Sequence, residues 1–176
     1  MYPFFRMGWQ FGLNKIRGPI DFDQTHISRH ICTPFDIDFW MEMNNGRILT
    51  LYDLGRIPFA ARTGLLTVLK ENRWGITVAG STTRYRHRVR LFDRIELHSA
   101  ALGRDERFLY LMHTMWHNGK AVNSALIRSA VTSQDGIVPT DRVAAAMGVP
   151  DWNPDLPEWV QKWIEAENIR SWPPEV

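Results

Sequence analysis

The apolar positions in the middle of the chain repeat with the period of a helix. They recur at i, i+3, i+4, i+7 and i+11, which places them on one helical face, and further apolar residues lie on the other faces. A helix that is apolar nearly all round is typically enclosed by the rest of the fold. Asn is a favoured N-cap, so residues 44–46 predict the helix start and Gly64 its end. The positions that carry the pattern are Ile48, Leu51, Tyr52, Gly55 and Phe59.

Alternating apolar and polar residues predict strands on both sides of this helix. One short strand is expected before the helix, over residues 27–33, and four follow it, over 74–91, 94–102, 106–117 and 120–132. Gly80 interrupts the first of the four and predicts a β-bulge. Asn118-Gly119 separates two alternating runs, which is the strongest short signal for a hairpin. We therefore expect an antiparallel sheet, with the four later strands in meander order, wrapped around the helix.

The two ends of the chain show weaker patterns. Residues 1–26 have no clean period and predict an irregular arm that packs through its aromatic side chains. Residues 136–176 predict a helical extension packed on the same domain, with short helices at 140–147 and 156–168. Trp159 and Trp163 lie four residues apart in the second helix, on the face expected to dock on the sheet. The α+β domain itself spans 27–135, and a homodimer is expected because a single curved sheet leaves an edge and a face exposed.

Composition excludes several classes of protein. The 176 residues carry 21 Lys and Arg against 19 Asp and Glu, a net charge of +2, whereas generic nucleic-acid binding needs a strong basic excess. The lone cysteine, Cys32, excludes an intrachain disulfide and a Cys-rich zinc site. No apolar run reaches the ~20 residues of a membrane span, and the N-terminal segment lacks the pattern of a signal peptide. The expected compartment is the cytoplasm.

The segment 35–47 carries the densest candidate chemistry. Its three carboxylates, Asp36, Asp38 and Glu42, lie among bulky apolar residues immediately before the predicted helix. Apolar neighbours remove hydration and raise a carboxyl pKa toward neutrality. The free N–H groups at a helix start stabilise developing negative charge. A base beside an oxyanion site is the minimum apparatus for acyl transfer. From spacing alone, the plainer interpretation stays open: the two Asp residues cap the loop, and Glu42 is solvated.

Two motifs of this region resemble a known family. Asp-x-Asp-x-x-x-x-Met-Asn-Asn-Gly-Arg over 36–47, followed by Tyr-Asp-Leu-Gly-Arg over 52–56, is similar to the hotdog-fold acyl-CoA thioesterases of the 4-hydroxybenzoyl-CoA type. The branch of thioesterase superfamily member six is nearest, and the likeness spans 27–168. It implies an α+β hotdog fold, a curved antiparallel sheet around one long helix, and hydrolysis of an acyl-CoA to free acid and coenzyme A. Coenzyme A is then part of the substrate, and no cofactor is expected.

The resemblance also implies roles for single residues. Asp38 matches the catalytic carboxylate, which either activates water or attacks the thioester carbonyl directly. The backbone N–H of Asn45 matches the oxyanion donor. Many relatives carry Asn two residues after that Asp and His four residues after it, where this chain has Trp40 and Glu42. Glu42 then serves as a replacement base or forms a coupled pair with Asp38. The alternative is a non-catalytic protein that binds acyl-CoA or an acyl carrier, and a hotdog hydratase ranks last because the His-bearing segment is missing.

A run of alternate arginines suggests where coenzyme A docks. In a regular strand, alternate positions share a face, and Arg meets phosphate with bidentate geometry. The resemblance supports a docking stripe, of which one or two members touch the ligand. The alternative is a solvated face balanced by acidic neighbours such as Glu96 and Asp105. The run consists of Arg84, Arg86, Arg88 and Arg90.

The remaining titratable residues favour no separate chemistry. His98, His113 and His117 lie on different predicted strands without the spacing of a metal site, and we interpret them as surface or interface residues. Cys32 has no neighbouring His or Lys to lower its pKa, which predicts an inert, half-buried thiol. Asp53 and Arg56 are three residues apart on the helix and predict a structural ion pair. The sequence therefore places its candidate chemistry in one loop, one helix start and one run of arginines.

Overall fold

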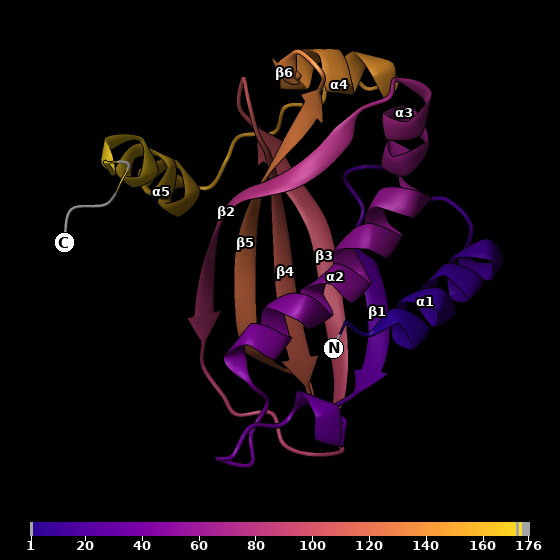
Figure 1. Cartoon of the computed structure of the whole chain (residues 1–176), viewed down its shortest axis with the longest axis vertical. Helices are drawn as coiled ribbons and strands as arrows, with labels where there is room; N and C mark the ends of the chain where they lie inside the picture. The colour runs from indigo at the N-terminus through magenta and orange to yellow at the C-terminus, as the bar shows by residue number, and fades with distance from the viewer. Residues whose placement is uncertain (1, 172, 174–176) are drawn as a thin grey trace.

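The computed structural model describes residues 2–171 and 173, which form one curved antiparallel sheet with helices packed against it. Figure 1 shows the long helix α2 lying across the concave face of the sheet. The elements in chain order are α1 (Phe4–Arg17), β1 (His26–Ile31), the 3-10 turn η1 (Pro34–Asp36), α2 (Asn45–Arg62), α3 (Leu65–Glu71), β2 (Gly75–Tyr85), β3 (Arg94–Arg104), β4 (Leu109–His117), β5 (Lys120–Ser133), β6 (Gly136–Ile137), α4 (Thr140–Ala146) and α5 (Glu158–Ile169).

The order of the strands differs from the expected meander. Strands β3, β4 and β5 do follow one another as neighbours, but β1 pairs with β3 and β2 pairs with β5, so the order is β1-β3-β4-β5-β2, with β6 also beside β5. The first strand after the helix therefore lies at the far edge of the sheet. Alternation within a strand reports which side chains face the core, whereas the choice of neighbouring strand depends on where the chain returns after α2 and α3.

Local turn and bulge signals are confirmed. The pairing of β2 with β5 shifts register between Val78 and Gly80, at the predicted bulge. Asn118 and Gly119 both have positive φ, and they join β4 to β5 as the expected two-residue hairpin. The predicted strand over 74–91 is too long, however, because β2 ends at Tyr85.

The N-terminal segment is a helix and not the irregular arm expected. Helix α1 packs beside α2 (Figure 1), and Asn14 donates a hydrogen bond to the carbonyl of Pro58 in α2 at 3.0 Å. The segment after α2 also forms a short helix, α3, which no pattern had suggested. Within the described residues, no helix is long and apolar enough to cross a membrane.

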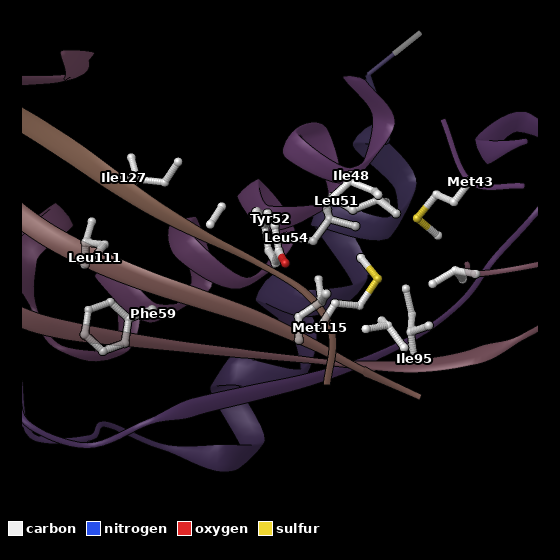
Figure 2. Close-up of a cluster of buried hydrophobic side chains, with 14 of the residues drawn as sticks. Met43, Ile48, Leu51, Tyr52, Leu54, Phe59, Ile95, Leu111, Met115 and Ile127 are labelled. Atoms are coloured by element: carbon white, nitrogen blue, oxygen red, sulfur yellow. The ribbon is translucent and has the colours of Figure 1, made fainter. Parts of the chain in front are cut away.

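The core lies between α2 and the inner face of the sheet. Figure 2 shows Leu51, Tyr52 and Phe59 of α2 among inward side chains of the strands, such as Met115. Burying such side chains stabilises a fold by about 1.5–3 kcal/mol each. Gly55 is required at the closest approach, because a Cβ there would overlap the Ser99 hydroxyl of β3.

Helix α5 covers part of the opposite face of the sheet. Val160 is fully buried there with Tyr110 and Leu126, and Trp163 packs against the same cluster. The expected docking of α5 is therefore right for Trp163. Trp159 is 48% exposed and lies at the margin of the cluster.

Candidate active site

The first aspartate of the loop is a structural residue. Asp36 is fully buried, and its two carboxylate oxygens lie 2.8 Å from Arg6 Nη2 and 2.7 Å from Arg47 Nε. The backbone amide and the hydroxyl of Thr33 also donate to it, each at 2.8 Å. Burial alone raises the pKa of Asp36, but the hydrogen bonds from Arg47, Thr33 and Arg6 outweigh it and hold this pKa below its usual value. Asp36 thus joins α1, the end of β1 and α2 through one ionised group.

The second aspartate begins a small hairpin that precedes α2. Asp38 N donates to the carbonyl of Glu42 at 2.9 Å, and Met41 N donates to the carbonyl of Asp38 at 3.1 Å. An isolated bridge between Ile37 and Met43 closes the hairpin. The Asp38 carboxylate is half-buried, and its Oδ1 accepts a hydrogen bond from the backbone of Trp40 at 2.9 Å. The side chain therefore has a fixed orientation in a short, hydrogen-bonded loop.

The start of α2 follows this hairpin directly. Asn44 is the N-cap, as the sequence predicts, and its Oδ1 accepts from the amide of Arg47 at 3.2 Å. The amides of Asn45 and Gly46 come too early in the helix to have an i−4 carbonyl partner. Asn44 N donates to the carbonyl of Asp36 at 2.9 Å, so the loop and the helix start form one unit. The helix start can bind an anionic oxygen through these amides.

The arginine run lies beside the hairpin but not as a strand. Only Arg84 belongs to β2. After Tyr85 the backbone leaves the ladder, because Arg86 N and His87 N both donate to the carbonyl of Val122, at 2.9 Å. The prediction that Arg84, Arg86, Arg88 and Arg90 share one strand face is therefore wrong, although all four side chains are exposed.

The segment after β2 instead contacts the loop that carries Asp38 and Glu42, through one hydrogen bond and one ion pair. Val89 O accepts from Met43 N at 2.8 Å, and Arg88 Nε lies 2.8 Å from Glu42 Oε2. Figure 1 shows the start of α2 and the β2–β3 connection at the same end of the molecule. The structure thus brings Arg88, one of the four arginines, to the loop that carries Asp38. Spacing along the chain gave no signal for this contact.

A single chain does not enclose these groups. The aromatic residues that follow Asp38 point outward: Phe39 and Trp40 are 79% and 67% exposed, with their ring centroids 3.6 Å apart and their planes tilted by 33°. The expected removal of hydration by these residues is therefore not present in one chain. Two cavities of the described residues lie elsewhere, one between α1 and the sheet and one near Trp159, and neither is lined by Asp38, Glu42 or Asn45.

The histidines and the cysteine differ in part from expectation. His113 is fully buried rather than superficial; its Nδ1 lies 2.9 Å from Ser99 Oγ, and burial lowers its pKa to about 3. Cys32 is also fully buried, and burial raises the pKa of its thiol to about 11. Among the described residues, no three His, Cys, Asp or Glu side chains come together in a group that could hold a metal ion.

One feature of this region, a capping box, was open to sequence reasoning and was not recognised. Thr33 lies three residues before Asp36, the spacing of a capping box, and both of its reciprocal hydrogen bonds are present. This pattern identifies Asp36 as a capping residue. The expected ion pair on α2 is confirmed, with Arg56 Nη2 2.5 Å from Asp53 Oδ1.

Comparison with known proteins identifies the family. The model of the thioesterase-like superfamily matches residues 32–164, and the chain belongs to this family. Protein THEM6 of Xenopus laevis is 27% identical over 154 residues, 86% of this chain and 72% of that protein. Protein THEM6 of Drosophila melanogaster is 25% identical over 144 residues, 80% of this chain and 72% of that protein.

Solved structures show the same fold. The probable thioesterase YbaW of Escherichia coli matches with a TM-score of 0.65 at 14% identity, over 69% of this chain and 96% of that one. Protein SAV2348 of Staphylococcus aureus, solved in complex with CoA, matches with a TM-score of 0.64 at 14% identity, over 81% and 96% of the two chains. The hotdog fold predicted from the sequence is confirmed.

Proposed function

We propose that this chain is a thioesterase that hydrolyses an acyl-CoA to a free acid and coenzyme A. The observation that carries the proposal is the position of Asp38. It begins a hydrogen-bonded hairpin that runs directly into the capped N-terminus of α2. A fixed carboxylate in the loop that leads into the helix-start amides suits attack on a carbonyl whose oxygen becomes negative. Membership of the thioesterase-like superfamily supports the choice of a thioester.

Two routes fit this arrangement. In the first, Asp38 takes a proton from water, and the resulting hydroxide oxygen bonds to the thioester carbon. In the second, an Asp38 oxygen bonds to that carbon, and water then hydrolyses the mixed anhydride. In both, the carbonyl oxygen accepts a hydrogen bond from Asn45 N–H, the carbon–sulfur bond breaks, and the thiolate of coenzyme A leaves and is protonated. Since Oδ1 is engaged with Trp40 N, Oδ2 is the oxygen that acts.

The arginines after β2 are the proposed contacts for the phosphates of coenzyme A. Arg84, Arg86 and Arg88 are exposed on a segment whose neighbour, Val89, bonds to the catalytic loop. Solved relatives include one in complex with CoA. Arg88 also pairs with Glu42, so phosphate binding competes with this pair and couples the ligand to the hairpin.

A second copy of the chain is the proposed cover of the site. Strand β2 is an eleven-residue edge strand whose outer hydrogen-bonding groups have no neighbouring strand among the described residues. Pairing of β2 with β2 of a second copy continues the sheet and removes this exposed edge. We expect a homodimer, or a tetramer built from two such dimers, which light scattering on a sizing column measures.

Activity is tested with a panel of acyl-CoA esters and detection of the free thiol released. Asp38→Asn is expected to lower kcat/KM by about 10²–10⁴, the range for loss of a general base. Asp23→Asn is the matched control, because Asp23 is an exposed aspartate in the loop before β1, and it is expected to leave the rate unchanged. Turnover of every substrate by Asp38→Asn at the wild-type rate overturns the proposal.

The second candidate is binding without hydrolysis. The observation that favours it is the Arg88–Glu42 ion pair, which occupies the carboxylate that stands where many relatives carry His. Calorimetric titration with a non-hydrolysable thioether analogue of an acyl-CoA separates the candidates. Tight binding of the analogue without turnover of any thioester assigns the protein to the second class.

A further inference from the structure

Three of the exposed apolar side chains of α1 lie on one face of the helix. Phe5, Trp9 and Ile16 are spaced i, i+4 and i+11, which aligns them on the outward side. They are 97%, 67% and 85% exposed. Contiguous exposed apolar surface of this kind marks an interaction site in most proteins.

The inward side of the same helix carries polar as well as apolar residues. Gln10 is 1% exposed, and Asn14 donates to the carbonyl of Pro58 at 3.0 Å. Met7 is buried, and Phe11 packs partly buried against the same core. A surface helix normally turns its apolar stripe toward the core, whereas α1 has apolar side chains on its outward side as well.

Ionic and hydrogen-bonded contacts hold α1 in this orientation. Near its start, Arg6 Nη2 binds Asp36 at 2.8 Å and Thr33 Oγ1 at 2.7 Å. At its end, Arg17 Nη1 donates to the carbonyl of Ile27 at 2.9 Å. The helix is therefore fixed at both ends, and its aromatic side chains cannot rotate into the core without breaking these contacts.

A groove extends the apolar surface from α1 onto the sheet. Its volume is about 1100 Å³, and it lies between α1 and strands β1, β3 and β4. The aromatic lining includes Phe5, Trp9 and Trp116. The charged lining includes Arg94 and the ion pair of Arg29 with Glu96 at 2.7 Å.

Helix α1 itself is positively charged, although Asp36 balances its Arg6. Helix α1 carries Arg6, Lys15 and Arg17 and no acidic residue. Among the described residues, Lys15 and Arg17 form no ion pair with a carboxylate. The nearest acidic residues along the chain, Asp21 and Asp23, lie in the loop after the helix.

We infer that the outward face of α1 docks on the surface of an anionic lipid bilayer. An amphipathic helix with aromatic residues on one side and cations at its flanks has the composition of helices that lie in the membrane interface. A second copy fits this face less well, since a two-fold interface sets the patch against the same patch of the partner, and α1 has no acidic residue to pair with Lys15 and Arg17. The inference does not depend on the thioesterase activity.

Vesicle sedimentation with the full chain tests the inference. The wild-type protein is expected to bind vesicles of phosphatidylglycerol and phosphatidylcholine, and to bind vesicles of phosphatidylcholine alone much more weakly. Replacing Phe5 and Trp9 by Ser is expected to reduce binding at least tenfold, because each ring loses its buried area. Lys15→Glu changes the charge by two units, and each unit is expected to weaken vesicle binding about fivefold. Ile169→Ser is the matched control, since Ile169 is 87% exposed on α5, and it is expected to bind as the wild type does.

A second measurement does not depend on the serine variants folding. Lipids brominated in their acyl chains quench a tryptophan that enters the bilayer, so part of the wild-type fluorescence is expected to be quenched. Trp9→Phe keeps the apolar face and is expected to bind equally while losing that quenching. Absence of wild-type binding to anionic vesicles, or equal quenching in Trp9→Phe, overturns the inference. A dimer that the Phe5 and Trp9 replacements dissociate, without vesicle binding, assigns the face to a second copy.

Discussion

The two aspartates of the loop are predicted to respond differently to replacement by asparagine. Asp36→Asn is expected to lower the stability of the fold, whereas Asp38→Asn is expected to lower the activity and leave the stability nearly unchanged. Asp36 is fully buried, between Arg6 and Arg47, whereas Asp38 is half-buried and accepts one backbone hydrogen bond. Asp36→Asn removes the charge and leaves two guanidinium groups around a neutral amide. Asp38→Asn keeps an oxygen that accepts from Trp40 N.

The magnitude follows from the burial of the pairs. Breaking a buried ion pair by removing one partner costs about 3–5 kcal/mol. The Arg6 and Arg47 side chains are 22% and 14% exposed, and this partial solvation places Asp36→Asn near the lower end, about 3 kcal/mol. The total stability of a domain is about 5–15 kcal/mol, so the loss is a large fraction of it. Asp38→Asn is expected to change the free energy of unfolding by less than about 0.5 kcal/mol, as for most surface substitutions.

Urea unfolding followed by circular dichroism measures both variants against the wild type. For Asp36→Asn the midpoint is expected to fall at an unchanged m-value, which identifies a change in stability rather than in the denatured state. Equal stability of Asp36→Asn and the wild type would refute the structural role of Asp36. Equal destabilisation by Asp38→Asn would refute the division of roles between the two residues.

Two further predictions concern the core. Gly55→Ala is expected to destabilise the protein by about 1–3 kcal/mol, the usual cost of overpacking, because the new Cβ meets Ser99 Oγ. Gly8→Ala, at an open position of α1, is the control. Equal urea midpoints for the Gly55→Ala variant and the wild type would contradict the close approach. Burial, with help from nearby arginines, lowers the pKa of His26 and His30 to about 4 and that of His113 to about 3. In the unfolded chain each histidine takes up a proton near pH 6.5, whereas in the folded protein it stays neutral down to its lowered pKa. The free energy of unfolding is therefore highest above pH 6.5 and decreases as the pH falls toward 4. The decrease is about 2 kcal/mol for each histidine by pH 5. A free energy of unfolding that stays constant from pH 7 to pH 5 would contradict this.

Local patterns predicted the parts of the fold that local forces determine. The 3.6-residue period of α2, its Asn44 cap and the Asn118-Gly119 turn are each set by a few neighbouring residues, and each was predictable. Helix α1 was missed because its apolar side chains lie on both the inward and the outward side, so they form no single stripe along the sequence. The order of the strands was missed because β2 pairs with β5, forty residues or more away along the chain for most of its length.

The candidate site was predicted in part for the same reason. The helix start and the loop carboxylates follow one another in the sequence, whereas the pairing of Arg88 with Glu42 joins segments that only the fold brings together. The alternate arginines have the period of a strand, but two amides share the carbonyl of Val122 and the backbone leaves the sheet there. Composition also does not distinguish Asp36 from Asp38, and burial does.

The central claim is that Asp38 and the amide of Asn45 act on one carbonyl group. A crystal structure of Asp38→Asn with a bound acyl-CoA tests it most directly, because the substitution preserves the loop and slows turnover. The thioester carbonyl oxygen is expected 2.7–3.1 Å from Asn45 N, with the thioester carbon next to the side chain at position 38 and a phosphate on Arg84, Arg86 or Arg88. A thioester bound away from the start of α2, in the groove beside α1 or elsewhere, would contradict the account.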